Sequence, residues 1–173
     1  MRKLMGGCIA VLVVAMSTGS GVAESAAAAL YGPACEFEAI LYFSGFKGVD
    51  AWIIPPETAL ETGEWCQTGK TRLIMQHDGN LVVYDEDGRP RWASGTWGPL
   101  RISRAVMQDD GNFVVYDSSG PRWESNTCCV DRRYVLAVQS DGNVVIYDRG
   151  IYHGGPSEDP NLWTPVWATN TSH

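Results

Sequence analysis

The nine residues QHDGNLVVY at positions 76–84 have two close copies further along the chain, QDDGNFVVY at 108–116 and QSDGNVVIY at 139–147. The copies share the pattern Q-x-D-x-N-x-V-x-Y and begin 32 and then 31 residues apart. A pattern that returns at this spacing predicts three similar supersecondary units. Because the polar side chains are kept in every copy, we expect a binding surface that is also repeated.

Each copy predicts the end of one strand, a tight Asp-Gly turn and a second strand. Side chains alternate between the two faces of a strand, so Asn80, Val82 and Tyr84 share one face, and Gln76 joins them from the strand before. The opposite face is apolar and we expect it in the core: Leu73, Met75, Leu81 and Val83 in the first copy, Ala105, Met107, Phe113 and Val115 in the second, and Leu136, Val138, Val144 and Ile146 in the third.

The polar set of each copy suits a ligand that is rich in hydroxyl groups. Asp accepts hydrogen bonds, Gln and Asn both donate and accept, and Tyr adds a hydroxyl, which together match adjacent sugar hydroxyls. The Val between them offers an apolar contact for the C–H patches of a sugar ring. A turn alone requires Asp-Gly but neither the Gln nor the Tyr, so the full pattern favours a ligand over a purely structural role.

The motif and its surroundings, roughly residues 38–171, resemble the bulb-type mannose-binding lectins, a family with the β-prism II fold. The resemblance extends to the phrases that close each copy, WASGT at 92–96, WESNT at 123–127 and WATNT at 167–171. It implies an all-β fold of three four-stranded antiparallel subdomains with pseudo-threefold symmetry, and it places the closing Trp residues in the core. A single lectin domain is expected over residues 30–173, with repeats at about 66–98, 99–129 and 130–171.

The same resemblance implies three sites for α-D-mannose and mannose-rich glycans. In each, Asp and Asn would bind the 2-hydroxyl, Gln the 3-hydroxyl and Tyr the 4-hydroxyl, while Val packs against the ring. Site one is Gln76, Asp78, Asn80, Val82 and Tyr84, site two is Gln108, Asp110, Asn112, Val114 and Tyr116, and site three is Gln139, Asp141, Asn143, Val145 and Tyr147. The implied function is that of a non-enzymatic lectin. The alternative is a lectin-like antibacterial toxin or defence protein that uses mannose binding to dock.

Two segments depart from the family pattern, residues 43–55 after the opening strand and residues 149–165 in the third repeat. Their aromatic residues Trp52, Tyr152 and Trp163 either stack on further sugars or fill the edge of the core. We expect site three, beside the longer loop, to differ most in accessibility or specificity. In the family the C-terminal strand is often exchanged between protomers, and Trp167–Thr171 could form a homodimer in this way.

The N-terminal sequence predicts secretion. Arg2 and Lys3, an apolar run over 8–16 and small residues up to Ala29 are typical of a signal peptide, removed after about residue 23–29. Four cysteines remain in the chain after removal of the signal peptide: Cys35, Cys66, Cys128 and Cys129. Since cysteines of secreted proteins usually form disulfides, we expect two disulfides, which can be arranged in three ways. We expect Cys35 and Cys66 each to pair with one of the two adjacent cysteines. A zinc site is the alternative, but the spacing lacks a C-x-x-C pair.

Charge and composition argue against other classes of protein. The formal net charge of −7 becomes about −9 without Arg2 and Lys3, or −8 if Glu24 is also removed, which disfavours nucleic acid as a partner. We expect no membrane insertion, because the apolar run is too short to span a bilayer. The three histidines are scattered and the carboxylates lie at turns, so we expect neither catalysis nor a metal or cofactor.

Overall fold

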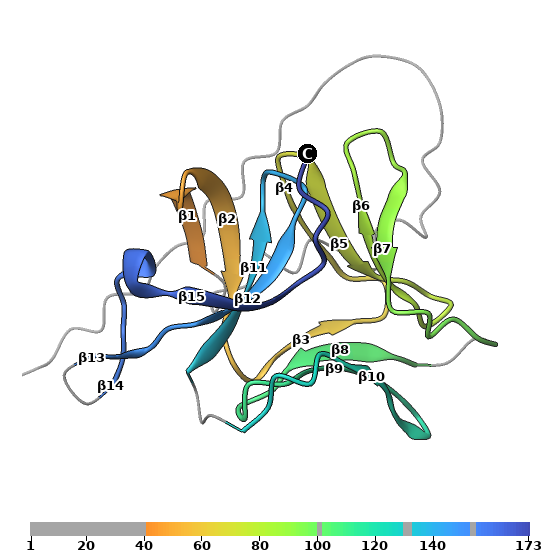
Figure 1. Cartoon of the computed structure of the whole chain (residues 1–173). Helices are drawn as coiled ribbons and strands as arrows, with labels where there is room; N and C mark the ends of the chain where they lie inside the picture. The colour runs from red at the N-terminus through yellow and green to blue at the C-terminus, as the bar shows by residue number, and fades with distance from the viewer. Residues whose placement is uncertain (1–40, 100–101, 130–132, 153–154) are drawn as a thin grey trace, which may run out of the picture. The chain divides into compact units, whose positions relative to one another are not determined.

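The computed structural model describes residues 41–99, 102–129, 133–152 and 155–173 (Figure 1). Its regular elements are β-strands, apart from the single 3₁₀ turn η2 (Pro160–Leu162) found in these residues. The sheets that carry the three motifs are antiparallel, which confirms the expected all-β fold. Within the described ranges no helix has the length and apolar character needed to cross a membrane. The expected signal peptide and Cys35 lie outside the described residues.

The first motif lies in a four-stranded sheet in which neighbours in space are also neighbours in sequence. Its strands are β4 (Trp65–Thr68), β5 (Thr71–Met75), β6 (Leu81–Tyr84) and β7 (Pro90–Ala93), in that order. The motif spans the turn between β5 and β6, as the sequence predicts. The pairing of β6 with β7 shifts register between Val83 and Tyr84.

The second motif lies in a sheet of the same kind, but one strand comes from elsewhere in the chain. The order is β10 (Gly120–Glu124), β9 (Phe113–Asp117), β8 (Arg104–Met107) and then β3 (Thr58–Glu61). Strand β3 precedes the entire first motif in sequence. The second repeat therefore completes its sheet with a distant strand.

The third motif lies in a sheet with five strands. The order is β1 (Leu41–Phe46), β2 (Val49–Ile54), β11 (Tyr134–Gln139), β12 (Val144–Asp148) and β15 (Thr164–Ala168). The first of these strands is an addition to the four that each subdomain is expected to have. Strand β15 pairs with β12 of the same chain.

The two segments that depart from the family pattern take part in regular structure. Residues 43–55 supply most of the β1–β2 hairpin. The longer loop in the third repeat carries the two-stranded pair β13 (Ile151–Tyr152) and β14 (Gly155–Pro156), followed by η2. The hairpin is thus part of a sheet instead of a free loop.

The N-terminal part of the described chain places one strand in each of the three sheets. Strand β2 pairs with β11, β3 with β8, and β4 with β5. Three consecutive strands within residues 49–68 therefore complete the sheets of the third, second and first motif in turn (Figure 1). This long-range pairing ties the described parts of the three repeats into one compact unit.

The core confirms the strand parity predicted from the sequence. All twelve residues expected on the apolar face belong to one buried cluster, to which the N-terminal strands add Ile54, Leu60 and Cys66. The cluster contains residues from all three sheets, so each repeat buries its apolar face against the other two. Burial of this kind contributes roughly 25 cal/mol per Å² of apolar surface removed from water.

The three closing tryptophans meet one another beside this core. Their ring centroids are 5.2 Å apart for Trp92 and Trp123, 5.7 Å for Trp92 and Trp167, and 5.6 Å for Trp123 and Trp167, in edge-to-face arrangements. The rings are partly buried and pack against the main cluster. This agrees with the expected role in the core, and each repeat contributes one ring to a shared contact.

A second buried cluster lies on the third sheet. It joins Phe46, Ala51 and Ile53 of the N-terminal hairpin and Trp163 to motif residues Val145 and Tyr147, together with Val135 and Ala137. Trp163 is buried, and its indole Nε1 donates to the carbonyl of Ser157 at 2.8 Å. Trp52 packs against the main core. Two of the three loop aromatics therefore fill the edge of the core.

The expected pairing of Cys66 with one of the adjacent cysteines is wrong. Cys128 is bonded to its neighbour Cys129, and Cys66 is in a separate disulfide. The reason is their placement. Cys66 points from β4 into the buried core, whereas Cys128 and Cys129 are exposed beyond the end of β10.

Candidate functional site

Each motif folds into the same hairpin turn. In the first, the Gln76 amide donates to the carbonyl of Asn80 at 2.8 Å and the Gly79 amide donates back to the carbonyl of Gln76 at 3.0 Å. The turn therefore has three residues, and of these only Gly79 has a positive φ, at 85°. The equivalent glycines of the other two motifs have φ values of 92° and 99°. Glycine adopts this conformation without the steric cost of a Cβ atom.

The motif Asp holds the turn with one of its oxygens. Asp78 Oδ1 accepts from the backbone amide of Asn80 at 3.0 Å, and the same contact is 3.0 Å in the second motif and 3.1 Å in the third. This local bond explains why a turn favours Asp here. The other oxygen, Oδ2, has no protein partner within the described part of the chain in any of the three copies, so it can accept from a ligand.

The side-chain amide of the motif Asn uses its oxygen to hold the closing phrase. Asn80 Oδ1 accepts from Ser94 Oγ at 3.1 Å and from the backbone amides of Gly95 at 3.0 Å and Thr96 at 3.2 Å. In the third motif, Asn143 Oδ1 accepts from Thr169 and Thr171 in the same way. These bonds fix which end of the amide faces inward, and they leave Nδ2 as a donor on the outer face.

The Gln and Tyr of each motif are joined to each other. Gln76 Nε2 donates to the Tyr84 hydroxyl at 2.8 Å. The matching distances are 2.8 Å in the second motif and 3.2 Å in the third. The bond crosses from the first strand to the second and leaves the Gln Oε1 acceptor and the Tyr hydroxyl proton available to a ligand.

The third and fifth residues of each closing phrase hold the motif in place, although the sequence predicted a role only for the Trp of these phrases. In the first repeat, Ser94 Oγ accepts from the Leu81 amide at 3.1 Å, and Thr96 Oγ1 donates to the carbonyl of Gly79 at 2.6 Å. The other repeats form the same bonds through Ser125, Thr127, Thr169 and Thr171. The threefold recurrence of Ser or Thr at these positions was the available signal.

The motif Val residues are buried although they lie on the outer face. Their exposed fractions are 2 % for Val82 and Val114 and 3 % for Val145. Neighbouring side chains cover them, so each forms a floor between polar groups and does not project into solvent. In site three all five motif residues line one hollow.

Site two has one contact that the other two sites lack in the described residues. Asn112 Nδ2 donates to Glu124 Oε2 at 2.7 Å. Glu124 lies on β10, directly across from Val114 on β9. The amide end that faces outward in sites one and three is engaged here by a carboxylate.

Site three lies in a hollow of about 380 Å³ that is lined by all five motif residues and by Lys47. The ammonium group of Lys47 is 5.8 Å from the centroid of the Tyr147 ring. Phe46 packs edge-on against the same ring, with centroids 5.2 Å apart. Burial raises the pKa of Tyr147, which keeps its hydroxyl protonated at neutral pH.

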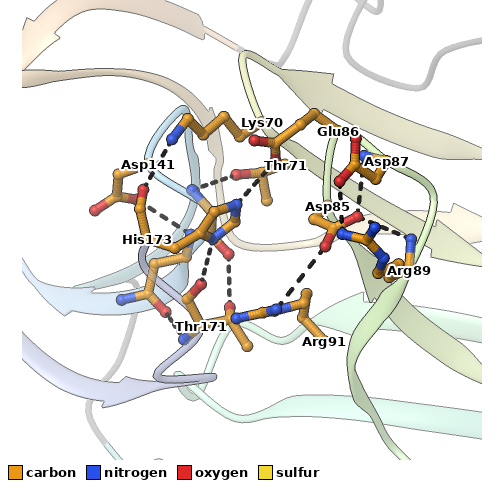
Figure 2. Close-up of polar contacts among 12 residues, drawn as sticks. Lys70, Thr71, Asp85, Glu86, Asp87, Arg89, Arg91, Asp141, Thr171 and His173 are labelled. Carbon is orange, nitrogen blue, oxygen red and sulfur yellow. Dashed lines mark hydrogen bonds and ion pairs between the residues drawn. The ribbon is translucent and has the colours of Figure 1, made fainter.

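Site one opens onto a cavity of about 450 Å³. Gln76 and Tyr84 line it together with Lys70, Arg72 and Glu86. Figure 2 shows the polar contacts beside it, where His173 reaches across from the end of the third repeat to Glu86. The residues that surround the motif therefore differ from one repeat to the next.

Comparison with known proteins places the chain among lectins. No family model and no curated protein matched it, but solved structures did. A monomeric monocot mannose-binding lectin from Gastrodia elata is 38 % identical, with a TM-score of 0.59, over 70 % of this chain and 98 % of that one. The snowdrop (Galanthus nivalis) mannose-specific agglutinin, solved with methyl α-D-mannoside, is 42 % identical over 62 % and 98 %, with a TM-score of 0.53. The Polygonatum cyrtonema lectin, solved with a monomannoside, is 37 % identical over 62 % and 98 %, with a TM-score of 0.52.

The fold and the repeated polar site define a carbohydrate-binding lectin of the β-prism II class. The chain belongs to the family of bulb-type mannose-binding lectins.

Proposed function

We propose that this chain is a secreted lectin that binds terminal α-D-mannose and mannose-rich glycans through its Q-x-D-x-N-x-V-x-Y sites, without catalysing a reaction on them. The observation that carries the proposal is the threefold recurrence of one hydrogen-bonding arrangement. In sites one and three each polar motif residue uses one polar atom for internal bonds and keeps another available to a ligand, as the Gln76 to Tyr84 bond and the Asn80 Oδ1 contacts illustrate. Site two has the same internal bonds, but Asn112 Nδ2 also donates to Glu124.

The free atoms of site one complement a mannose ring. Asp78 Oδ2 and the Gln76 carbonyl oxygen accept, Asn80 Nδ2 donates, and the Tyr84 hydroxyl donates its proton. A sugar hydroxyl both donates and accepts, so it can bridge an acceptor and a donor of this set. Because the groups are already held in place, binding does not have to order them.

A single site should bind weakly. Each hydrogen bond contributes about 0.5 to 1.5 kcal/mol net, and the ordering of the sugar offsets part of it, so a Kd of roughly millimolar is expected for one mannose. Strong attachment to a glycan surface then requires several sites to bind at once. The relatives solved with methyl α-D-mannoside and with a monomannoside support mannose as the sugar.

A glycan array tests the proposal. The decisive variant combines Asn80→Asp, Asn112→Asp and Asn143→Asp, because Asp keeps the oxygen that accepts from the closing phrase and replaces only the Nδ2 donor. We expect wild type to bind mannose-terminated glycans and the triple variant to lose this signal. The control Asn161→Asp makes the same change at an exposed position outside the sites. Near-UV circular dichroism of the tryptophan cluster verifies that both variants are folded.

Two results would refute the mannose proposal: no mannose signal from wild type, or an unchanged signal from a folded triple variant. Secretion has its own test. The N-terminal pattern and the Cys128–Cys129 disulfide support export to an oxidising compartment. Expression in a secreting host should release a chain that begins between about residues 24 and 30, which N-terminal sequencing would identify.

A further inference from the structure

The three sites have identical motifs but differ at one position of the closing strand. The residue directly across from the motif Val is Ala93 in the first repeat and Ala168 in the third. In the second repeat it is Glu124, opposite Val114. Residues directly opposite in antiparallel strands point to the same face, so all three side chains stand beside the Val floor of their site.

Glu124 turns its carboxylate over the site instead of away from it. Its Oε2 accepts from Asn112 Nδ2 at 2.7 Å. The oxygen of the same amide is bonded to Ser125 Oγ at 3.1 Å and to the Thr127 amide at 3.4 Å. Both ends of the Asn112 amide are therefore engaged by the protein, whereas the Asn80 and Asn143 amides have only their oxygens so engaged within the described residues.

Exposure agrees with this difference. Asn112 is buried, at 6 % exposed, while Asn80 and Asn143 remain partly exposed. A Glu side chain in place of a methyl group also fills space beside the floor on which a sugar ring would rest. A sugar that enters site two must displace the carboxylate from Asn112 and lose a charge-assisted hydrogen bond, which is stronger than the neutral bond that replaces it.

We propose that Glu124 is a specificity-determining residue that closes site two to neutral mannosides, so that the chain binds them at sites one and three. The inference rests on the proposed function, since it concerns which of the three mannose sites are open. The sequence of the second motif does not reveal that the site is closed, because Glu124 lies outside the motif.

Site-resolved NMR of the full chain tests the inference. Methyl α-D-mannoside is titrated into ¹⁵N-labelled protein, and the backbone amides of Tyr84, Tyr116 and Tyr147 report on the three sites. In wild type we expect Tyr84 and Tyr147 to titrate and Tyr116 to respond at least about tenfold more weakly. In Glu124→Ala, which reproduces the residue of the other two sites, Tyr116 should titrate within roughly threefold of Tyr84.

A reciprocal variant and a control complete the design. Ala93→Glu should weaken site one by about tenfold and leave Tyr147 unchanged. Glu61→Ala removes an exposed carboxylate from β3, the edge strand of the same sheet, and should change none of the three responses. The inference is overturned if Tyr116 titrates together with Tyr84 in wild type, or if Tyr116 stays silent in Glu124→Ala while Tyr84 responds. If no tyrosine responds in any variant, the proposed function itself fails and the inference falls with it.

Discussion

His173 Nε2 lies 2.8 Å from Glu86 Oε2, so His173 contacts the loop between β6 and β7, the third and fourth strands of the first sheet (Figure 2). The backbone amide of His173 also donates to the carbonyl of Asp141 at 2.9 Å, and Lys70 Nζ donates to the His173 carbonyl at 3.1 Å. These contacts connect the turn of the third motif to the cavity beside site one. The contact between His173 and Glu86 is an ion pair only when His173 is protonated.

Stability should vary with pH through this pair. Glu86 and then the Thr171 carbonyl raise the pKa of His173, so its contribution is complete below the ordinary value of 6.5 and is lost as pH rises through the raised pKa. His173 lowers the pKa of Glu86, whose contribution is present above 4.5 and is lost as pH falls through the lowered pKa. Both contributions are complete between about pH 4.5 and 6.5.

The measurement is the midpoint of thermal unfolding for wild type and His173→Gln. The stabilisation of wild type over the variant should be larger at pH 5.5 than at pH 8.5, and it should be small because both side chains are partly exposed. Glu86→Gln should remove the same pH dependence. An equal difference at the two pH values would show that the pair does not titrate as expected.

Removal of one ring from the tryptophan cluster should destabilise the whole unit. Trp123 contacts Trp92 and Trp167 at ring centroid distances of 5.2 and 5.6 Å, so Trp123→Ala leaves a gap that all three repeats share. We expect a loss of about 3 kcal/mol in the free energy of unfolding, measured with urea. The control Trp97→Ala removes an indole that is 70 % exposed and should cost far less. Similar losses in both variants would contradict a role for the cluster.

Alanine substitutions at three glycines can distinguish the cost of backbone strain from the cost of steric crowding. Gly111 has a φ of 92°, and a Cβ atom there would lie 2.7 Å from the ring of Tyr134. Gly88 has a φ of 75° but open space around it, and Gly98 has neither constraint. Replacement by Ala should cost about 1 to 2 kcal/mol at Gly88, more at Gly111 and little at Gly98. Equal costs at Gly88 and Gly111 in urea unfolding would exclude the contact with Tyr134 as a constraint.

The adjacent disulfide can be tested by mass spectrometry. Trypsin releases residues 123–132 as one peptide, which contains both Cys128 and Cys129. We expect the unreduced peptide to run alone and to be lighter by two hydrogen atoms than the reduced one, because its disulfide is internal. A peptide joined to the one that carries Cys66 would instead restore the pairing expected from the sequence.

The parts of the fold that follow from local pattern could be predicted from the sequence. Strand parity is a property of neighbouring residues, so the inward positions of Leu73 and Met75 and the outward position of Tyr84 follow from alternation alone. The turn glycines follow in the same way, although only the Gly of each turn adopts a positive φ. The family resemblance then supplied the number of sheets.

The features that could not be predicted depend on which strands lie beside each other. Glu124 affects site two because it lies opposite Val114 on the neighbouring strand. Phe46 affects site three because its hairpin joins the sheet of a motif about 100 residues away. Likewise, Cys66 points into the core because of its position on β4, whereas Cys128 is exposed. Nothing in the spacing of these residues along the chain encodes such contacts.

The distribution of the N-terminal strands also affects how the chain is made. Ile54 of β2 pairs opposite Leu136 of β11, and Ala59 of β3 pairs opposite Val106 of β8, so these two long-range pairings must wait for strands that are synthesised later. Until then, β2 can pair with β1 but its buried residues have no core to pack against. Vectorial synthesis therefore delays closure of the third sheet until β15 has been made, and a nascent chain with such a delay is exposed to aggregation.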